Sequence, residues 1–91
     1  MINHELHPKL KPSIIYSELG NKEVVILNFE TKYLYTLNEV GTRIWQLLNG
    51  NNSINDIVGV IVNEYDIDRE AALKSVTYQI EEFINEKMVE L

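Results

Sequence analysis

The stretch Tyr33-Leu34-Tyr35-Thr36-Leu37-Asn38-Glu39-Val40-Gly41 decides the fold, because its pattern changes at Asn38. Before Asn38 the side chains alternate, with Leu34 on one face and Tyr33 and Tyr35 on the other, which predicts a β-strand. Asn38 is well placed as the N-cap of a helix from about Glu39 to Leu48. The sequence therefore predicts strands before this point and helices after it.

Two further strands are predicted upstream, over Ser13–Glu18 and Glu23–Phe29. Gly20-Asn21 supplies the positive φ that a tight hairpin between them needs. Four consecutive apolar residues, Val24 to Leu27, predict that the second strand is covered on both faces. A short turn at Glu30-Thr31-Lys32 leads into the third strand, so we expect a three-stranded antiparallel meander.

Two further helices are predicted downstream. Ser53-Ile54-Asn55-Asp56 nearly matches a capping box and begins one of them. Asp68 caps the other, from about Arg69 to Glu86, whose core side includes Val76 and Phe83. The tail, Met88 to Leu91, is apolar enough to pack back on the domain. The order βββααα predicts an α+β domain in which the helices cover the sheet.

Composition limits the possible functions. The chain has 91 residues, no cysteine and a net charge of −6, from 8 basic and 14 acidic residues. Without cysteine, a disulfide scaffold and a thiolate nucleophile are excluded. The acidity argues against nucleic-acid binding. No apolar run is long enough to span a membrane, and Met1–Glu5 does not resemble a signal peptide, so we expect a cytoplasmic protein.

The N-terminal region differs from the rest of the chain. Pro8 and Pro12 predict an extended arm over residues 1–12, before a single domain over residues 13–91. His4 and His7 are three positions apart, but Pro8 disfavours the helix that a metal-binding pair would need. We therefore expect no metal site here.

The acidic residues of the last helix bear on two possible functions, catalysis and DNA binding. We interpret its glutamates as a solvated face, and we predict no catalytic residue, no cofactor and no enzymatic activity. The strand–helix order also admits a winged-helix DNA-binding regulator, whose last helix would enter a groove. Four acids on that helix, Glu70, Glu81, Glu82 and Glu86, face only two or three cations, which opposes this alternative.

The third strand is the strongest candidate for binding. After Lys32 it contains neither proline nor charge, so its edge could accept a peptide as an added strand. Two alternatives remain: Tyr33 and Tyr35 simply cover the sheet, or the edge pairs in a homodimer.

From about His7 to Leu91 the chain resembles the PqqD-like domain, also called the precursor peptide recognition element of RiPPs (ribosomally made, post-translationally modified peptides). The Tyr33–Gly41 stretch resembles the family's motif of an aromatic residue followed by Leu-Asn-x-x-Gly. The other matching segments are His7-Pro8-Lys9, Leu27-Asn28, Ile44–Gly50 and Glu64–Asp68.

The resemblance implies a winged-helix-like fold and a non-catalytic adaptor. Such a domain captures the leader segment of a precursor peptide and presents it to a modifying enzyme, either a radical SAM enzyme or a leader peptidase. The family serves the synthesis of quinone cofactors such as PQQ, lasso peptides and radical-modified peptides.

The resemblance also implies the site. The leader would pair with the third strand, at Tyr33, Leu34, Tyr35, Thr36 and Leu37, in a groove formed with the last helix. For that helix two walls are open: the flank with Leu73, Thr77, Ile80 and Ile84, or the side with Lys74, Tyr78 and Glu81. We favour the first flank, because Leu73 and Thr77 border the core face on a helical wheel. Trp45 is expected in the core, and it is also a candidate docking surface for the enzyme.

Overall fold

A small antiparallel sheet and three helices make up the computed structural model, which describes residues 3–20 and 23–91. The predicted α+β class, with three strands followed by three helices, is confirmed. The elements are β1 (Lys9–Leu10), β2 (Ile14–Glu18), β3 (Val24–Asn28), β4 (Leu34–Leu37), α1 (Glu39–Gln46), α2 (Ile54–Tyr65), α3 (Arg69–Asn85) and β5 (Val89–Glu90).

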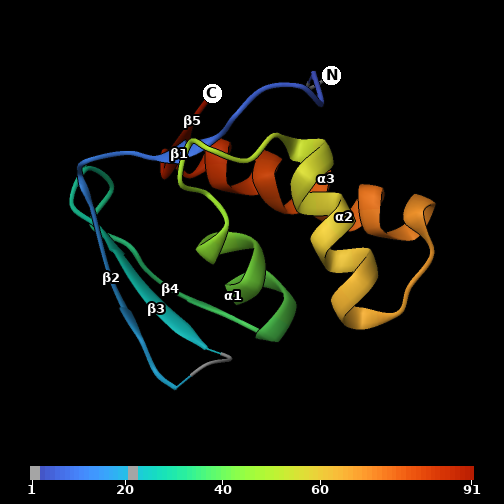
Figure 1. The fold of residues 1–91 in the computed structure, drawn as a ribbon. Coiled ribbons are helices and arrows are strands. Elements are labelled where there is room, and N and C mark those ends of the chain that lie inside the picture. The colour runs from blue at the N-terminus through green and yellow to red at the C-terminus, as the bar shows by residue number, and fades with distance from the viewer. Residues whose placement is uncertain (1–2, 21–22) are drawn as a thin grey trace.

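The main sheet has the order β2-β3-β4, so β3 is central and antiparallel to both neighbours. Val24 and Ile26 on β3 point to the inner face and are fully buried. All three helices lie on this side of the sheet (Figure 1). The prediction that β3 is covered on both faces is wrong. Val25 and Leu27 on the outer face are only half-buried, because neighbouring side chains shield them and no described helix does.

Trp45 of α1 lies at the centre of the core. Its side chain is 2% exposed. Its ring meets Tyr16 of β2 edge-on at 5.5 Å and Phe83 of α3 at 5.2 Å, between centroids. The expected core positions of Trp45, Val76 and Phe83 are thus confirmed. This burial removes Trp45 as a docking surface for an enzyme, because a partner could not reach it.

The helices begin where the sequence places their caps. The Asn38 side chain accepts a hydrogen bond from the Gly41 N–H at 2.9 Å. Ser53 and Asp56 form a complete capping box at the start of α2, and Asp68 caps α3. The α1 helix ends at Gln46, two residues earlier than predicted, because a tight turn follows in which the Leu47 N–H bonds to the Ile44 carbonyl.

A second, two-stranded sheet joins the ends of the described chain. Strand β1 pairs antiparallel with β5, and Met88 and Val89 are buried, so the tail packs back as predicted. The segment before β1 crosses the start of α2. There the carbonyls of Leu6 and His4 accept hydrogen bonds from the first N–H groups of the helix. At the β2–β3 hairpin Gly20 has φ of 74°, while Asn21 lies outside the described residues.

Within residues 3–20 and 23–91, no helix is long and apolar enough to cross a membrane. The same residues contain no group of three or more His, Asp or Glu side chains suited to a metal ion.

Candidate functional site

The outer edge of β4 is open. Within the described residues no strand pairs with it, because β4 is the last strand of the sheet. The Asn28 N–H donates to the Tyr33 carbonyl at 3.1 Å, which sets the phase of the β3–β4 ladder. By the alternation of antiparallel pairing, Tyr35 and Leu37 bond to β3. The N–H and C=O groups of Leu34 and Thr36 therefore point outward to the free edge.

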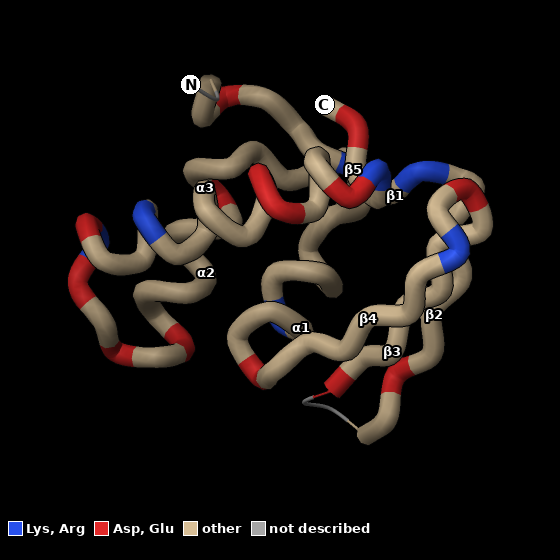
Figure 2. The backbone as a smooth tube through the Cα atoms, turned by 180° about the vertical axis from the view of Figure 1, so that it is seen from behind, with Lys and Arg blue, Asp and Glu red and all other residues tan. Residues whose placement is uncertain are grey.

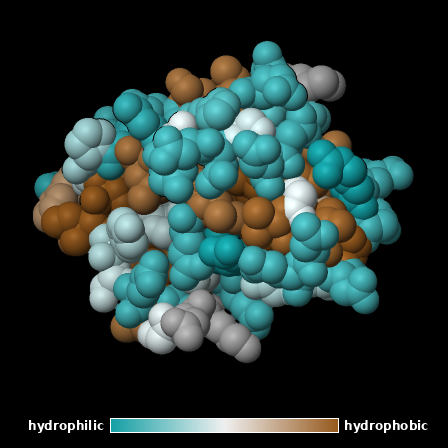
Figure 3. Space-filling view, in the orientation of Figure 1, coloured by the Kyte–Doolittle hydropathy of each residue, from teal (hydrophilic) through white to brown (hydrophobic). Residues whose placement is uncertain are grey.

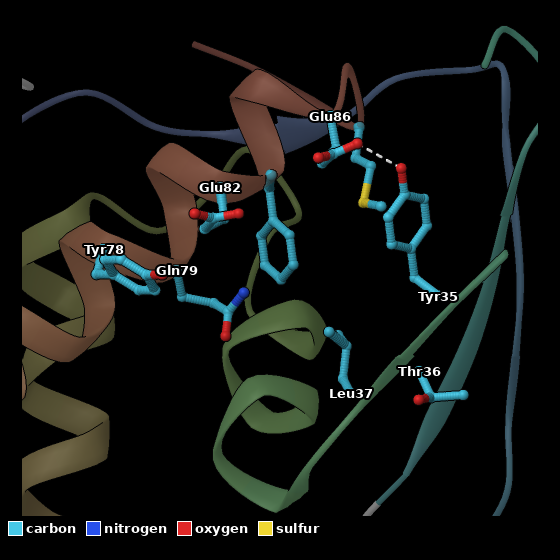
Figure 4. A pocket seen from close by; sticks show the side chains of 9 residues that line it. Tyr35, Thr36, Leu37, Tyr78, Gln79, Glu82 and Glu86 are labelled. Carbon is cyan, nitrogen blue, oxygen red and sulfur yellow. Dashed lines mark hydrogen bonds between the residues drawn. The ribbon is translucent and has the colours of Figure 1, made fainter. Parts of the chain in front are cut away.

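A pocket lies between this edge and α3, as Figure 4 shows. Its volume is about 270 Å³. The buried side chains of Phe83 and Met88 give it an apolar floor. The full lining is Tyr35, Thr36, Leu37, Tyr78, Gln79, Glu82, Phe83, Glu86 and Met88.

The structure brings together only some of the residues predicted for the site. Tyr35, Thr36, Leu37 and Tyr78 line the pocket. Leu34 is 67% exposed on the outer face of β4, beside the open edge. The ring of Tyr33 lies edge-on to that of Tyr35, with 6.3 Å between centroids. All of these lie on or beside the groove, and their contact with a peptide stays a prediction.

The favoured flank of the last helix lies elsewhere. Ile80 is fully buried in the core, and Leu73 and Ile84 pack against that core. The Thr77 hydroxyl donates to the Leu73 carbonyl at 2.7 Å. The α3 wall of the pocket is instead the side that carries Tyr78. The reason is the rotation of α3, which points the Ala72–Val76–Ile80 stripe at the core and leaves the next stripe facing β4.

Gln79, Glu82, Glu86 and Met88 line the pocket but were not predicted. A signal was present: Tyr78, Glu82 and Glu86 are spaced four apart, so they share one helix face. That face looks like an ordinary solvated surface in the sequence. Only its position opposite a free strand edge makes it the wall of a site.

Asn28 fixes the two walls relative to each other. It is fully buried at the end of β3. Its side-chain amide donates to the Glu86 carbonyl at 2.7 Å, and its oxygen accepts from the Glu30 N–H at 2.9 Å. It therefore ties the β3–β4 turn to the last turn of α3. A buried amide at an inward-facing strand position was a usable signal, because such groups are bonded when buried.

A second link crosses the pocket from side chain to side chain. The Tyr35 hydroxyl donates to the Glu86 carboxylate, as drawn in Figure 4. This hydrogen bond raises the pKa of Tyr35, because ionising the phenol would lose it and place two negative charges side by side. One end of the pocket is thus bridged by a pair that stays intact at neutral pH.

The charge distribution does not support the winged-helix DNA alternative. Figure 2 shows acidic residues along α3 and around its start, with few cations among them. One of those cations, Lys74, is paired with an acid of the same helix, with 3.9 Å between its Nζ and the Oε1 of Glu70. Duplex binding needs clustered Lys and Arg, and α3 does not present them.

The fold and the groove together define a class: a small winged-helix-like α+β domain with a free strand edge facing a helix. The chain belongs to the PqqD family, since the family's sequence model, described as "Coenzyme PQQ synthesis protein D (PqqD)", matches residues 23–89.

Two solved structures share this fold. One is described as "TbiB1 in Complex with the TbiA(beta) Leader Peptide"; it has a TM-score of 0.84 and 28% identity, over 90% of this chain and 94% of that chain. The other is "Lasso peptide synthetase B1 complexed with the leader peptide", with a TM-score of 0.81 and 20% identity, over 93% and 99% of the two chains. At that identity the second likeness concerns the fold alone. A comparison with curated proteins found no match.

Proposed function

We propose that this protein is a peptide-binding adaptor, which captures the leader segment of a ribosomally made precursor peptide and presents it to a modifying enzyme. The observation that carries the proposal is the open β4 edge beside a pocket on α3. Membership of the PqqD family supports it, and so does the 28% identity to a protein solved with a leader peptide.

The leader would bind as a fourth strand. The outward N–H and C=O groups of Leu34 and Thr36 would supply its backbone hydrogen bonds, which any sequence can accept. Alternate side chains of the leader would point toward α3, where the pocket selects among them. A micromolar dissociation constant corresponds to about −8 kcal/mol, which a few such bonds and one or two filled pockets can supply.

The domain itself would lower no chemical barrier. It would hold the leader, and the rest of the precursor would reach the docked enzyme at a raised effective concentration. Because the precursor is a translated peptide, this role places the protein in the cytoplasm. The enzyme, a radical SAM enzyme or a leader peptidase, belongs to the same proposal.

The enzyme needs a surface that the leader leaves free. The outer face of the sheet carries apolar side chains that no described helix covers: Ile15, Val25, Leu27 and Leu34. Figure 3 shows apolar side chains reaching the surface where the sheet lies. A leader strand added to β4 would extend this same face. We place the enzyme there, since uncovered apolar surface of this kind marks interaction sites.

An NMR titration tests the adaptor role. The ¹⁵N-labelled protein would be titrated with the leader half of the precursor peptide encoded beside its gene. We expect the largest amide shifts at Leu34–Leu37 and along Tyr78–Glu86, and none of comparable size on β2. Shifts centred on β2 or on α2 would contradict strand addition at β4.

A further inference from the structure

We propose that the β4–α3 pocket selects a lysine or arginine side chain of the bound peptide, seated on the apolar floor with its cation against Glu82 and Glu86. This inference rests on the adaptor role above and names the chemistry of its ligand. It concerns the pocket alone, so it can fail while strand addition stands.

The register fixes which peptide side chain reaches the pocket. Tyr35 and Leu37 share the inner face of the sheet with Ile26 and Val24. A peptide residue opposite either of them also points to the inner face, and therefore toward α3. Its neighbours in the peptide point to the outer face. One position, or two positions separated by one residue, can thus enter the pocket.

The lining suits a long side chain that is apolar along its stem and charged at its tip. Phe83 and Met88 are buried and form the floor, while Glu82 and Glu86 are half-buried at the α3 wall. In Figure 4 the Glu82 and Glu86 side chains lie one turn apart along α3. Lysine and arginine bury their methylene stems on apolar surface and keep the charged head at a polar rim.

Among residues 3–20 and 23–91, no cationic side chain forms an ion pair with either carboxylate. Ion pairs among the described residues join Lys9 to Glu90, Arg43 to Glu64, Lys74 to Glu70 and Lys87 to Glu30, and none involves Glu82 or Glu86. One Glu86 oxygen already accepts the Tyr35 hydroxyl. Two partly desolvated carboxylates on one wall favour an incoming cation and repel an acidic side chain.

Selection from a library of random twelve-residue peptides by mRNA display tests the pocket directly, with the immobilised full chain as bait. We expect wild-type protein to enrich peptides with Lys or Arg at one fixed position among β-forming residues. The double variant Glu82→Gln, Glu86→Gln should lose the preference for Lys or Arg at that position. It should still enrich peptides whose other positions are β-forming residues. For a selected peptide, Glu82→Gln should weaken binding about tenfold or more, as expected for the loss of a hydrogen bond to a charged group.

A charge swap and a matched control sharpen the test. Glu82→Lys should turn the preference at the same position toward Asp or Glu. Glu81→Gln removes the neighbouring, exposed carboxylate that does not line the pocket, and should leave the preference unchanged. Thermal melts would confirm that each variant is folded.

Two results would overturn the inference. Enriched peptides with tyrosine or an aliphatic residue at the inward position would reject the cationic ligand and keep the adaptor role. No enrichment by wild-type protein, under conditions where a known peptide-binding domain selects its ligands, would count against the pocket and the adaptor role together.

Discussion

The two edges of the sheet offer the same backbone chemistry but different surroundings. At β4 the outward groups belong to Leu34 and Thr36; at β2, by the same alternation, they belong to Tyr16 and Glu18. The β4 edge has a pocket beside it, walled by α3. A free edge alone binds strands without discrimination, whereas an edge facing a helix can also read side chains.

The β2 edge also carries features that discourage pairing. Its last residue, Glu18, is charged and exposed. Exposed charge on an edge strand is a common device against unwanted strand addition. The difference between the edges therefore has two causes: β4 gains a helix wall, and β2 keeps a charged end.

The largest expected effect is on stability, from removing the core side chain that packs beneath both edges of the sheet. Trp45 packs on Tyr16 under β2 and on Phe83 under the pocket. Trp45→Ala should lower the free energy of unfolding by about 3–5 kcal/mol, because it leaves a large cavity in the core. Urea unfolding measures this. Tyr78→Ala, on the exposed rim of the same pocket, should change stability by less than about 0.5 kcal/mol. Equal losses in the two variants would refute the buried position of Trp45.

A pair of proline variants tests the comparison itself. Thr36→Pro removes an outward N–H of β4, and Glu18→Pro removes an outward N–H of β2. If the peptide adds to β4, Thr36→Pro should weaken binding tenfold or more, about 1.4 kcal/mol, while Glu18→Pro leaves it unchanged. Isothermal titration calorimetry with the precursor's leader measures both.

The register decides which residue suits this test. The Tyr35 N–H faces β3, so Tyr35→Pro would break the sheet itself and confuse folding with binding. Thr36 avoids this problem. If both edge prolines weakened the leader equally, or if neither did, the assignment of β4 as the binding edge would be wrong.

Much of the fold was predictable because the signals were local. Asn38, Ser53 and Asp68 cap their helices as the sequence indicates, and each bond spans only three residues. The covering of β3 was not predictable in the same way. A run of apolar residues shows that a strand is partly buried, but it does not show on how many faces.

The site was predictable on one wall only. The strand edge follows from strand order and from the absence of charge after Lys32. The helix wall depends on the rotation of α3 about its axis, and a helical wheel could not distinguish a core border from a groove. The hydrogen bond from Asn28 to the Glu86 carbonyl was also not predictable, because the two residues are 58 positions apart in the sequence.

The smallest expected effect concerns the hydrogen bond from Tyr35 on β4 to Glu86 at the end of α3. The hydrogen bond to Glu86 raises the pKa of Tyr35. A group whose pKa is raised by folding stabilises the protein fully below its unfolded pKa of about 10, and that contribution disappears as the pH rises through the folded pKa. Wild-type protein should therefore lose stability in alkali partly through Tyr35.

Urea unfolding at about pH 8 and about pH 11, on either side of the ordinary tyrosine pKa, measures this loss. Tyr35→Phe should reduce the alkaline loss, because the hydrogen bond to Glu86 is already absent at the lower pH. Tyr16→Phe, on the other edge, keeps the Tyr35–Glu86 pair and should retain the wild-type loss. Burial raises the pKa of Tyr65, which is present in all three proteins and cancels in the comparison. If Tyr35→Phe lost as much stability as wild type between the two pH values, the hydrogen bond from Tyr35 to Glu86 would not be formed in solution.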